Sequence, residues 1–187
     1  MTASFRTSQT VSALDPSKPH IVLVGLPGAG KSTVGALLGQ KLSRTFLDFD
    51  AEIERREAMT IPQIFGERGE PAFRELERKL TMELKDLGNM VLSPGGGWIT
   101  DTEAVSMLRP PAMLVYLRAR PETALKRLGG AAGARPLLNK PDPLGELNKL
   151  FEARKLAYQA ADLEISTELY NPEQVTQEII KKVGVGK

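Results

Sequence analysis

The stretch Gly25-Leu26-Pro27-Gly28-Ala29-Gly30-Lys31-Ser32-Thr33 decides the fold, because it matches the phosphate-loop pattern G-x-x-x-x-G-K-[ST]. An apolar run at 20–24 precedes it as a predicted strand, and apolar residues recur at helical spacing over 34–42. In this order, the N–H groups of the loop and the helix N-terminus converge on one anion. The stretch therefore predicts an α/β domain that binds a nucleotide. The alternative is an ordinary glycine turn between a strand and a helix.

Each part of the loop has a predicted role in binding ATP. Lys31 is expected to reach the terminal phosphates as a point charge, and the Ser32 hydroxyl to be a ligand of Mg²⁺. The predicted ATP contacts in the loop are Gly28, Ala29, Gly30, Lys31, Ser32 and Thr33.

Length and composition narrow the class of protein. A chain of 187 residues is long enough for one domain with a full core and too short for two of ordinary size. A net charge of +2 is too small to favour nucleic acid, and no stretch approaches the length of a membrane-spanning helix. The sequence has no cysteine, which excludes disulfides and thiolate chemistry. We therefore expect no nucleic-acid or membrane partner, and a cytoplasmic location.

The first 19 residues differ in composition from the rest. They contain seven Ser or Thr, with Arg6 as the only charge before Asp15, and no apolar segment typical of a secretory signal. We expect a disordered tail at 1–19 and a single domain at 20–187. A transit peptide is the alternative for the tail.

Two acids follow the second apolar run, residues 45–50. Asp48 and Asp50 are two residues apart, so a strand would direct both to the same side at its carboxyl end, where α/β sheets bind ligands. One carboxylate is expected to hold Mg²⁺ through water, and the other to accept a proton from a substrate hydroxyl. The alternative is that Asp50 merely caps the helix that opens at Ala51.

Arg74 lies near the beginning of an amphipathic helix that follows Pro71 and continues to Leu84. Taken alone, it predicts a surface ion pair with Glu70, four residues before it, or with Glu77, three residues after it.

Glycines mark two further segments. A third predicted strand at 89–93 leads into Pro94-Gly95-Gly96-Gly97-Trp98, and three consecutive glycines at a strand end indicate close approach of a ligand or backbone. The alternative there is a flexible turn. After a fourth strand at 113–117, glycines surround Arg135, which favours a mobile lid at about 129–143 that carries this cation over the phosphates. As composition alone, that segment is a loop.

Together these landmarks resemble shikimate kinases, small P-loop enzymes of aromatic amino acid biosynthesis. The resemblance spans about 20–182, and the phosphate loop alone would name only a superfamily. The specific motifs are Asp48-x-Asp50, Gly69-Glu70-x-x-Phe73-Arg74-x-x-Glu77, Gly95-Gly96-Gly97, Arg135-Pro136-Leu137-Leu138 and Arg154-x-x-x-Tyr158.

The resemblance implies the P-loop kinase fold, with five parallel strands in the order 2-3-1-4-5, helices on both faces and a mobile lid. It implies transfer of the γ-phosphate of ATP to the 3-hydroxyl of shikimate, with Mg²⁺ required, and it favours a monomer. The resemblance does not determine the shape of the pocket floor. This chain has Pro94 and Trp98 at positions where shikimate kinases more often have small residues.

The resemblance also implies roles for single residues. Lys31, Asp50 and Arg135 would be catalytic, and Asp48 would organise Mg²⁺ through water beside Ser32. The residues implied to bind shikimate are Asp50, Arg74, Gly96, Gly97 and Arg154, and those implied to border the adenine are Arg127 and Pro172.

Two other functions are alternatives. Another small-molecule kinase, for gluconate or a nucleoside monophosphate, would keep the phosphate loop without a reason to combine Asp50, Arg74 and Arg154. A regulatory module would bind nucleotide or shikimate without turnover, and its lysine and carboxylates would not need to be intact.

Overall fold

The computed structural model describes residues 19–132 and 135–184. Residues 1–18 of the expected tail and residues 133–134 of the expected lid lie outside the described residues. The strands are β1 (Ile21–Val24), β2 (Thr45–Asp48), β3 (Met90–Ser93), β4 (Met113–Arg118) and β5 (Leu163–Ser166). The helices are α1 (Lys31–Leu42), α2 (Phe49–Glu57), α3 (Ile61–Leu84), α4 (Thr102–Leu108), α5 (Pro121–Leu128), α6 (Pro143–Gln159) and α7 (Pro172–Gly184), with short 3₁₀ helices η1 (Trp98–Thr100) and η2 (Gly129–Ala132).

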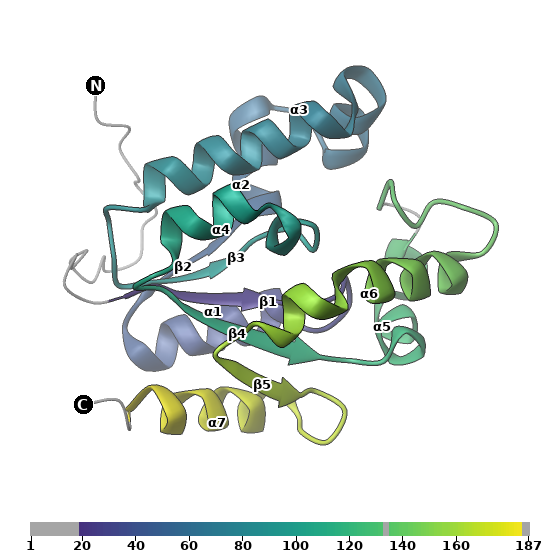
Figure 1. Cartoon of the computed structure of the whole chain (residues 1–187). Coiled ribbons are helices and arrows are strands. Elements are labelled where there is room, and N and C mark those ends of the chain that lie inside the picture. The colour runs from purple at the N-terminus through teal and green to yellow at the C-terminus, as the bar shows by residue number, and fades with distance from the viewer. Residues whose placement is uncertain (1–18, 133–134, 185–187) are drawn as a thin grey trace.

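The five strands form one sheet in the order β2-β3-β1-β4-β5, and every described pair is parallel. This confirms the strand order that the resemblance implies. Because parallel strands run in one direction, their carboxyl ends lie along the same edge of the sheet. That edge receives the phosphate loop after β1, the acids after β2 and the glycines after β3 (Figure 1).

Helices cover both faces of the sheet. α1 and α7 pack side by side on one face, and α3 and α4 lie on the other (Figure 1). Both faces of the central strand β1 are covered, and each of its four residues is at most 3% exposed. This agrees with the continuous apolar sequence of β1, which is typical of a strand in a parallel sheet. Among the described helices, none is both long and apolar enough to cross a membrane.

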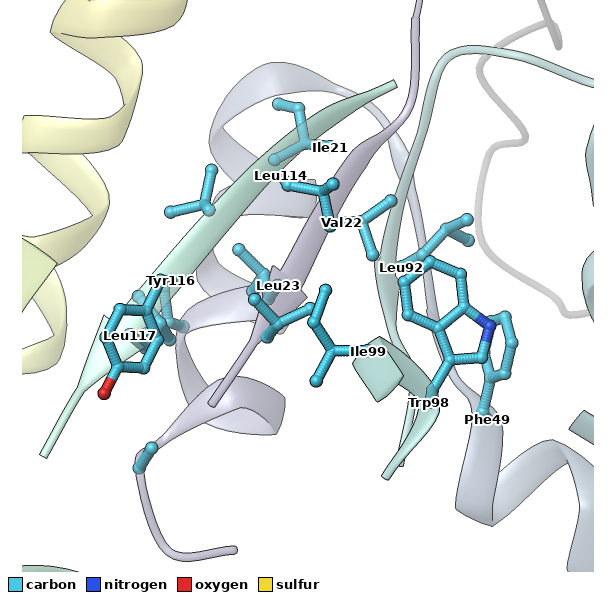
Figure 2. Close-up of a cluster of buried hydrophobic side chains, with 14 of the residues drawn as sticks. Ile21, Val22, Leu23, Phe49, Leu92, Trp98, Ile99, Leu114, Tyr116 and Leu117 are labelled. Carbon is cyan, nitrogen blue, oxygen red and sulfur yellow. The ribbon is translucent and has the colours of Figure 1, made fainter. Parts of the chain in front are cut away.

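Trp98 belongs to the core. Its ring is 1% exposed and lies in the buried cluster that also contains Phe49 and Leu92 (Figure 2). The indole N–H donates a hydrogen bond of 3.0 Å to the Thr81 hydroxyl, so its one polar group is satisfied. The bulky side chain that follows the glycines therefore points into the core and does not cover the glycines.

The end of β2 differs from the prediction. The strand stops at Asp48, whose Oδ1 accepts hydrogen bonds from the backbone N–H groups of Asp50 and Ala51. Asp48 is thus the N-cap of α2, and the helix begins one residue later. The expectation that a strand directs both acids to one side was wrong, because Asp50 lies in the first turn of a helix. The alternative prediction, that Asp50 caps the helix, was also wrong, because Asp48 is the N-cap.

α3 consists of two helical segments joined at Gly69. The first opens with a capping box, in which Thr60 and Gln63 each accept a hydrogen bond from the other's backbone N–H. Gly69 has φ 80° and ψ 168°, a conformation that favours glycine, and Pro71 follows in the first turn of the second segment. The second segment carries Arg74 to the carboxyl edge of the sheet.

Candidate active site

A cavity of about 280 Å³ lies at the carboxyl edge of the sheet. Its walls come from the phosphate loop, the start of α2, α3, the glycine loop after β3, the segment after η2, and α6. It brings together six residues predicted from the sequence: Asp50, Arg74, Gly96, Gly97, Arg135 and Arg154. Segments far apart in the chain therefore build one site.

The phosphate loop ends in a helix N-terminus suited to an anion. Gly30 is the N-cap of α1 with φ 95°, and no side chain caps the helix. Its first turn contains no acidic residue. The first N–H groups of α1 are therefore suited to a phosphate.

Lys31 lies along the inside of the loop. Its Nζ donates to the carbonyl oxygens of Gly25, at 3.1 Å, and Leu26, at 3.3 Å. Burial lowers the pKa of Lys31 to about 8, and the positive charge of Arg135 contributes to the decrease. An anion here would restore the ordinary pKa of the lysine, because it favours the charged form.

Ser32 and Asp48 form an oxygen pair beside Lys31. The Ser32 hydroxyl donates a hydrogen bond of 2.6 Å to Asp48 Oδ2, and the other Asp48 oxygen is used in capping α2. Hydroxyl and carboxylate oxygens are suitable ligands for Mg²⁺, which usually binds few protein oxygens and keeps several waters. The predicted pair is thus brought together, and its chemistry fits this ion.

The two oxygens of Asp50 differ in their surroundings. Oδ1 is buried and has no hydrogen-bond partner among the described residues, whereas Oδ2 lies 3.7 Å from Arg135 Nη1. The side chain remains 33% exposed, so Oδ2 faces the cavity. Burial raises the pKa of Asp50, and the negative charge of Asp48 raises it further. A carboxylate with a raised pKa is a stronger proton acceptor, as a general base requires.

Arg74 is held by both of the acids that helical spacing predicted as partners. Its Nε and Nη2 donate to Glu70 Oε1, at 3.2 and 2.7 Å, and its Nη1 donates to Glu77 Oε2 at 2.5 Å. The side chain of Glu70 is 46% exposed, but that of Glu77 is 2% exposed. The surface ion-pair interpretation therefore describes Glu70 only, since Glu77 is a buried partner.

The three glycines after β3 each face a different charged group. A Cβ atom at Gly95 would lie 2.5 Å from Glu77 Oε1, and one at Gly96 would lie 3.0 Å from Arg154 Nη1. At Gly97 it would lie 2.6 Å from Arg74 Cζ. The triple glycine is therefore a close-approach site, as predicted. It allows two guanidinium groups and a carboxylate to pack against the backbone.

Gly97→Ala is expected to weaken binding of an anion at Arg74 by at least about tenfold, because the methyl group displaces the guanidinium by an ångström or more. The obstructing atoms are the far end of a flexible side chain, but the same guanidinium is the partner of the buried Glu77 carboxylate, so the free energy of unfolding should also fall. The measurement is calorimetric affinity together with urea denaturation. Gly66→Ala is the control, because a Cβ there meets open space. Unchanged affinity in Gly97→Ala would contradict the packing role.

Arg154 approaches the cavity from α6. It is 6% exposed, and its charge contributes to the lowered pKa of Lys31, after the larger effect of burial. Arg135 and the three residues after it also line the cavity, and Leu138 is 1% exposed. Backbone hydrogen bonds from Leu138 and Asn139 to the Arg135 carbonyl shape this segment, at 2.9 and 3.0 Å.

The two residues expected near the adenine lie away from the cavity walls. Arg127 at the end of α5 donates to the hydroxyl and the carbonyl of Thr167, at 2.9 and 2.7 Å. Thr167 directly follows β5, and Pro172 begins α7. The structure therefore ties Arg127 to the segment that leads to Pro172.

Sequence reasoning gave no site role to several residues of this region. Glu77 was considered only as a surface partner, although its place in the motif with Arg74 was a usable signal. Glu54 and the apolar residues Ile61, Phe65 and Phe73 line the cavity, and no sequence signal separated them from ordinary helix residues. Neither Pro94 nor Trp98 is among the lining residues that the structure describes, whereas the three glycines between them, Gly95, Gly96 and Gly97, all are.

Comparison with known proteins gives a consistent result. The family model described as shikimate kinase matches residues 27–184. A shikimate kinase of Caldicellulosiruptor saccharolyticus is 40% identical over 161 residues, which cover 86% of this chain and 93% of that protein. Another, from Persephonella marina, is 41% identical and covers 88% and 98% of the two chains. The structure of the Acinetobacter baumannii shikimate kinase in complex with shikimate aligns with a TM-score of 0.87 at 37% identity, covering 92% and 96%.

Proposed function

The chain belongs to the shikimate kinase family, and we propose how its residues transfer the γ-phosphate of ATP to the 3-hydroxyl of shikimate. One observation carries the proposal. Asp50, Arg74 and Arg154 line a single cavity that begins beside the phosphate loop. The cavity therefore offers a carboxylate for a hydroxyl and two guanidinium groups for an acid, next to the site for the nucleotide.

Arg74 and Arg154 bind the shikimate carboxylate. Each guanidinium presents a planar set of donors that matches a carboxylate, and lysine cannot reproduce this geometry. The backbone at Gly96 and Gly97 packs against the two guanidinium groups. A side chain at either position would occupy the space of Arg154 or Arg74. The carboxylate end of the substrate is thereby fixed, and the ring is directed toward Asp50.

Asp50 acts as the general base. The 3-hydroxyl of shikimate donates to Oδ2, the oxygen that faces the cavity, and its proton passes to this carboxylate as the hydroxyl oxygen attacks the γ-phosphorus. The bond between the γ-phosphorus and the β–γ bridging oxygen breaks, and ADP is the leaving group. Arg135 lies beside the same oxygen and can turn to the transferring phosphoryl group. Its positive charge then stabilises the negative charge that the phosphoryl oxygens carry in the transition state.

ATP binds through the phosphate loop. Residues 28–33 surround the phosphates, and Lys31 exchanges its two backbone carbonyl partners for phosphate oxygens. Ser32 and Asp48 would hold Mg²⁺, directly and through water, and the bound ion supplies neutralising charge to the phosphates. Arg127 and Pro172 border the adenine, as the family resemblance implies.

The segment at about 129–143 acts as a lid. In its described part, Arg135 and Leu138 line the cavity, and a Cβ at Gly129 or Gly130 would meet no atom of the described residues within 4 Å. Opening and closing would admit shikimate and then exclude water, which prevents hydrolysis of ATP. The family resemblance also supports a cytoplasmic monomer with its domain at 20–187.

The rival interpretations have less support. A nucleoside monophosphate has no carboxylate for Arg74 and Arg154 to bind. Gluconate does carry a carboxylate, but a gluconate kinase would share the phosphate loop without a reason to combine Asp50, Arg74 and Arg154 in one cavity. A regulatory module would not catalyse phosphoryl transfer. It would therefore not need Lys31, at the uncapped N-terminus of α1, together with Asp50.

The function is tested by measuring ADP release from ATP and Mg²⁺, with shikimate, quinate, gluconate and nucleoside monophosphates offered separately. We expect release with shikimate and rates at the background level with the others. Release with gluconate or a nucleotide in place of shikimate would contradict the assignment. Tight shikimate binding without release would favour the regulatory module.

A further inference from the structure

Glu77 is a buried acid whose two oxygens have unequal surroundings. Its side chain comes from the middle of α3 and is 2% exposed. Oε2 accepts the hydrogen bond from Arg74 Nη1, whereas Oε1 is buried without a partner among the described residues. A buried carboxylate oxygen without a donor destabilises the ionised form.

A second buried oxygen faces the same point. The Cβ position of Gly95 lies 2.5 Å from Glu77 Oε1 and 3.2 Å from Asp50 Oδ1, which is also buried without a partner among the described residues. The charged groups that face Glu77 are Arg74 from its own helix and Asp50 from α2. The β3–η1 loop brings the Gly95 backbone, whose N–H favours the ionised form of Glu77 and so opposes the rise of its pKa. Glu77 therefore has one opposite charge and one like charge beside it.

The pKa of Glu77 agrees with this geometry. Burial raises the pKa of the carboxyl to about 7, Arg74 opposes the increase, and Asp50 adds to it. The pKa of this carboxyl therefore lies in the neutral range, where a nearby charge can change its protonation.

Arg74 has N–H groups left for a substrate carboxylate, and a carboxylate bound there would affect the ionisation of Glu77. A guanidinium has five N–H groups, and three of these are used by Glu70 and Glu77. One N–H remains on each terminal nitrogen, the pair that can bind a carboxylate with two hydrogen bonds. A substrate carboxylate there brings a third negative charge to Arg74, which disfavours the ionised form of Glu77.

We propose that Glu77 is a positioning residue that acts through Arg74 and takes up a proton from solvent when the substrate carboxylate binds. The inference rests on the proposed role of Arg74 in shikimate binding. When protonated, Glu77 still accepts the Arg74 hydrogen bond through its carbonyl oxygen, so the guanidinium keeps its orientation while its charge is available to the substrate. By linkage, shikimate then binds more tightly to the protonated enzyme.

Calorimetry on the unmodified protein tests the inference without a variant. Shikimate is titrated in the absence of ATP, at pH 6.0–7.5, in buffers that differ in ionisation enthalpy. If binding raises the pKa of Glu77 by one unit, uptake is about 0.4 proton at pH 7, and affinity falls about threefold from pH 6.0 to 7.5. No proton uptake with constant affinity would overturn the inference. No shikimate binding at any pH would overturn the proposed role of Arg74 as well.

Two variants identify the group that takes up the proton. Glu77→Gln keeps an oxygen acceptor for Arg74 but cannot titrate, so proton uptake should disappear and affinity should vary less than about 1.5-fold over the same range. Glu75→Gln is the matched control, because Glu75 is on the same helix with a side chain that is 73% exposed, and proton uptake should match that of the unmodified protein. Undiminished uptake in Glu77→Gln would overturn the assignment to Glu77.

Discussion

Asp50→Asn is expected to lower kcat by about 10²–10⁴-fold, because the amide retains the size of the side chain but cannot accept the hydroxyl proton. The KM for ATP should change little, since the phosphate loop is left intact. Asp50 also has a buried oxygen without a hydrogen-bond partner among the described residues and a raised pKa. Removing its charge should therefore leave the free energy of unfolding unchanged or increase it, as expected where function opposes stability.

Coupled ADP release and urea denaturation of the same samples measure both effects. Asp86→Asn is the control for charge, because Asp86 is exposed and lies outside the cavity, and its kcat should be normal. A kcat for Asp50→Asn within tenfold of the unmodified enzyme would remove Asp50 from the role of base.

Lys31→Ala is expected to lower kcat by about 10³-fold or more, because phosphoryl transfer depends on positioned positive charge. The lowered pKa of about 8 adds a second expectation for the unmodified enzyme. Activity requires the charged lysine, so kcat/KM for ATP should fall as the pH rises through about 8. Bound phosphate favours the charged form, so kcat at saturation should fall only at higher pH.

The control is Lys41→Ala. Lys41 is in the last turn of the same helix, where it forms an exposed ion pair with Glu173, and its loss should change kcat by less than about twofold. Initial rates across pH 6–10 provide both comparisons. If Lys31→Ala retained a tenth of the normal rate, the lysine would not be the main source of charge stabilisation.

The part of the fold that follows from local sequence was predictable. The phosphate loop has its own pattern, and the apolar run of β1 indicates a strand covered on both faces. The order of the strands, in contrast, came from resemblance to a family. Pairing between strands is decided by contacts distant in sequence, and no spacing within one segment encodes them.

The site was predictable as a set of residues but not in its geometry. Asp48 and Asp50 were both identified, yet the strand rule failed because capping by Asp48 turns the chain into a helix at once. Glu77 shows the other limit. Helical spacing relates it to Arg74, but the position of its Oε1 against the Gly95 backbone depends on the glycine loop after β3, which is distant in sequence.

Trp98 gives the enzyme an intrinsic fluorescent probe, so no label has to be attached. It is the one tryptophan in the sequence, its ring is shielded from water, and it follows directly after the glycines that support the substrate-binding arginines. Its indole is joined through Thr81 to the carbonyl of Glu77, by bonds of 3.0 and 2.7 Å. Fluorescence emission should therefore start at short wavelength and respond to any shift of α3 against the glycine loop. Stopped-flow spectra of the unlabelled protein would then time any such shift after shikimate or ATP is added.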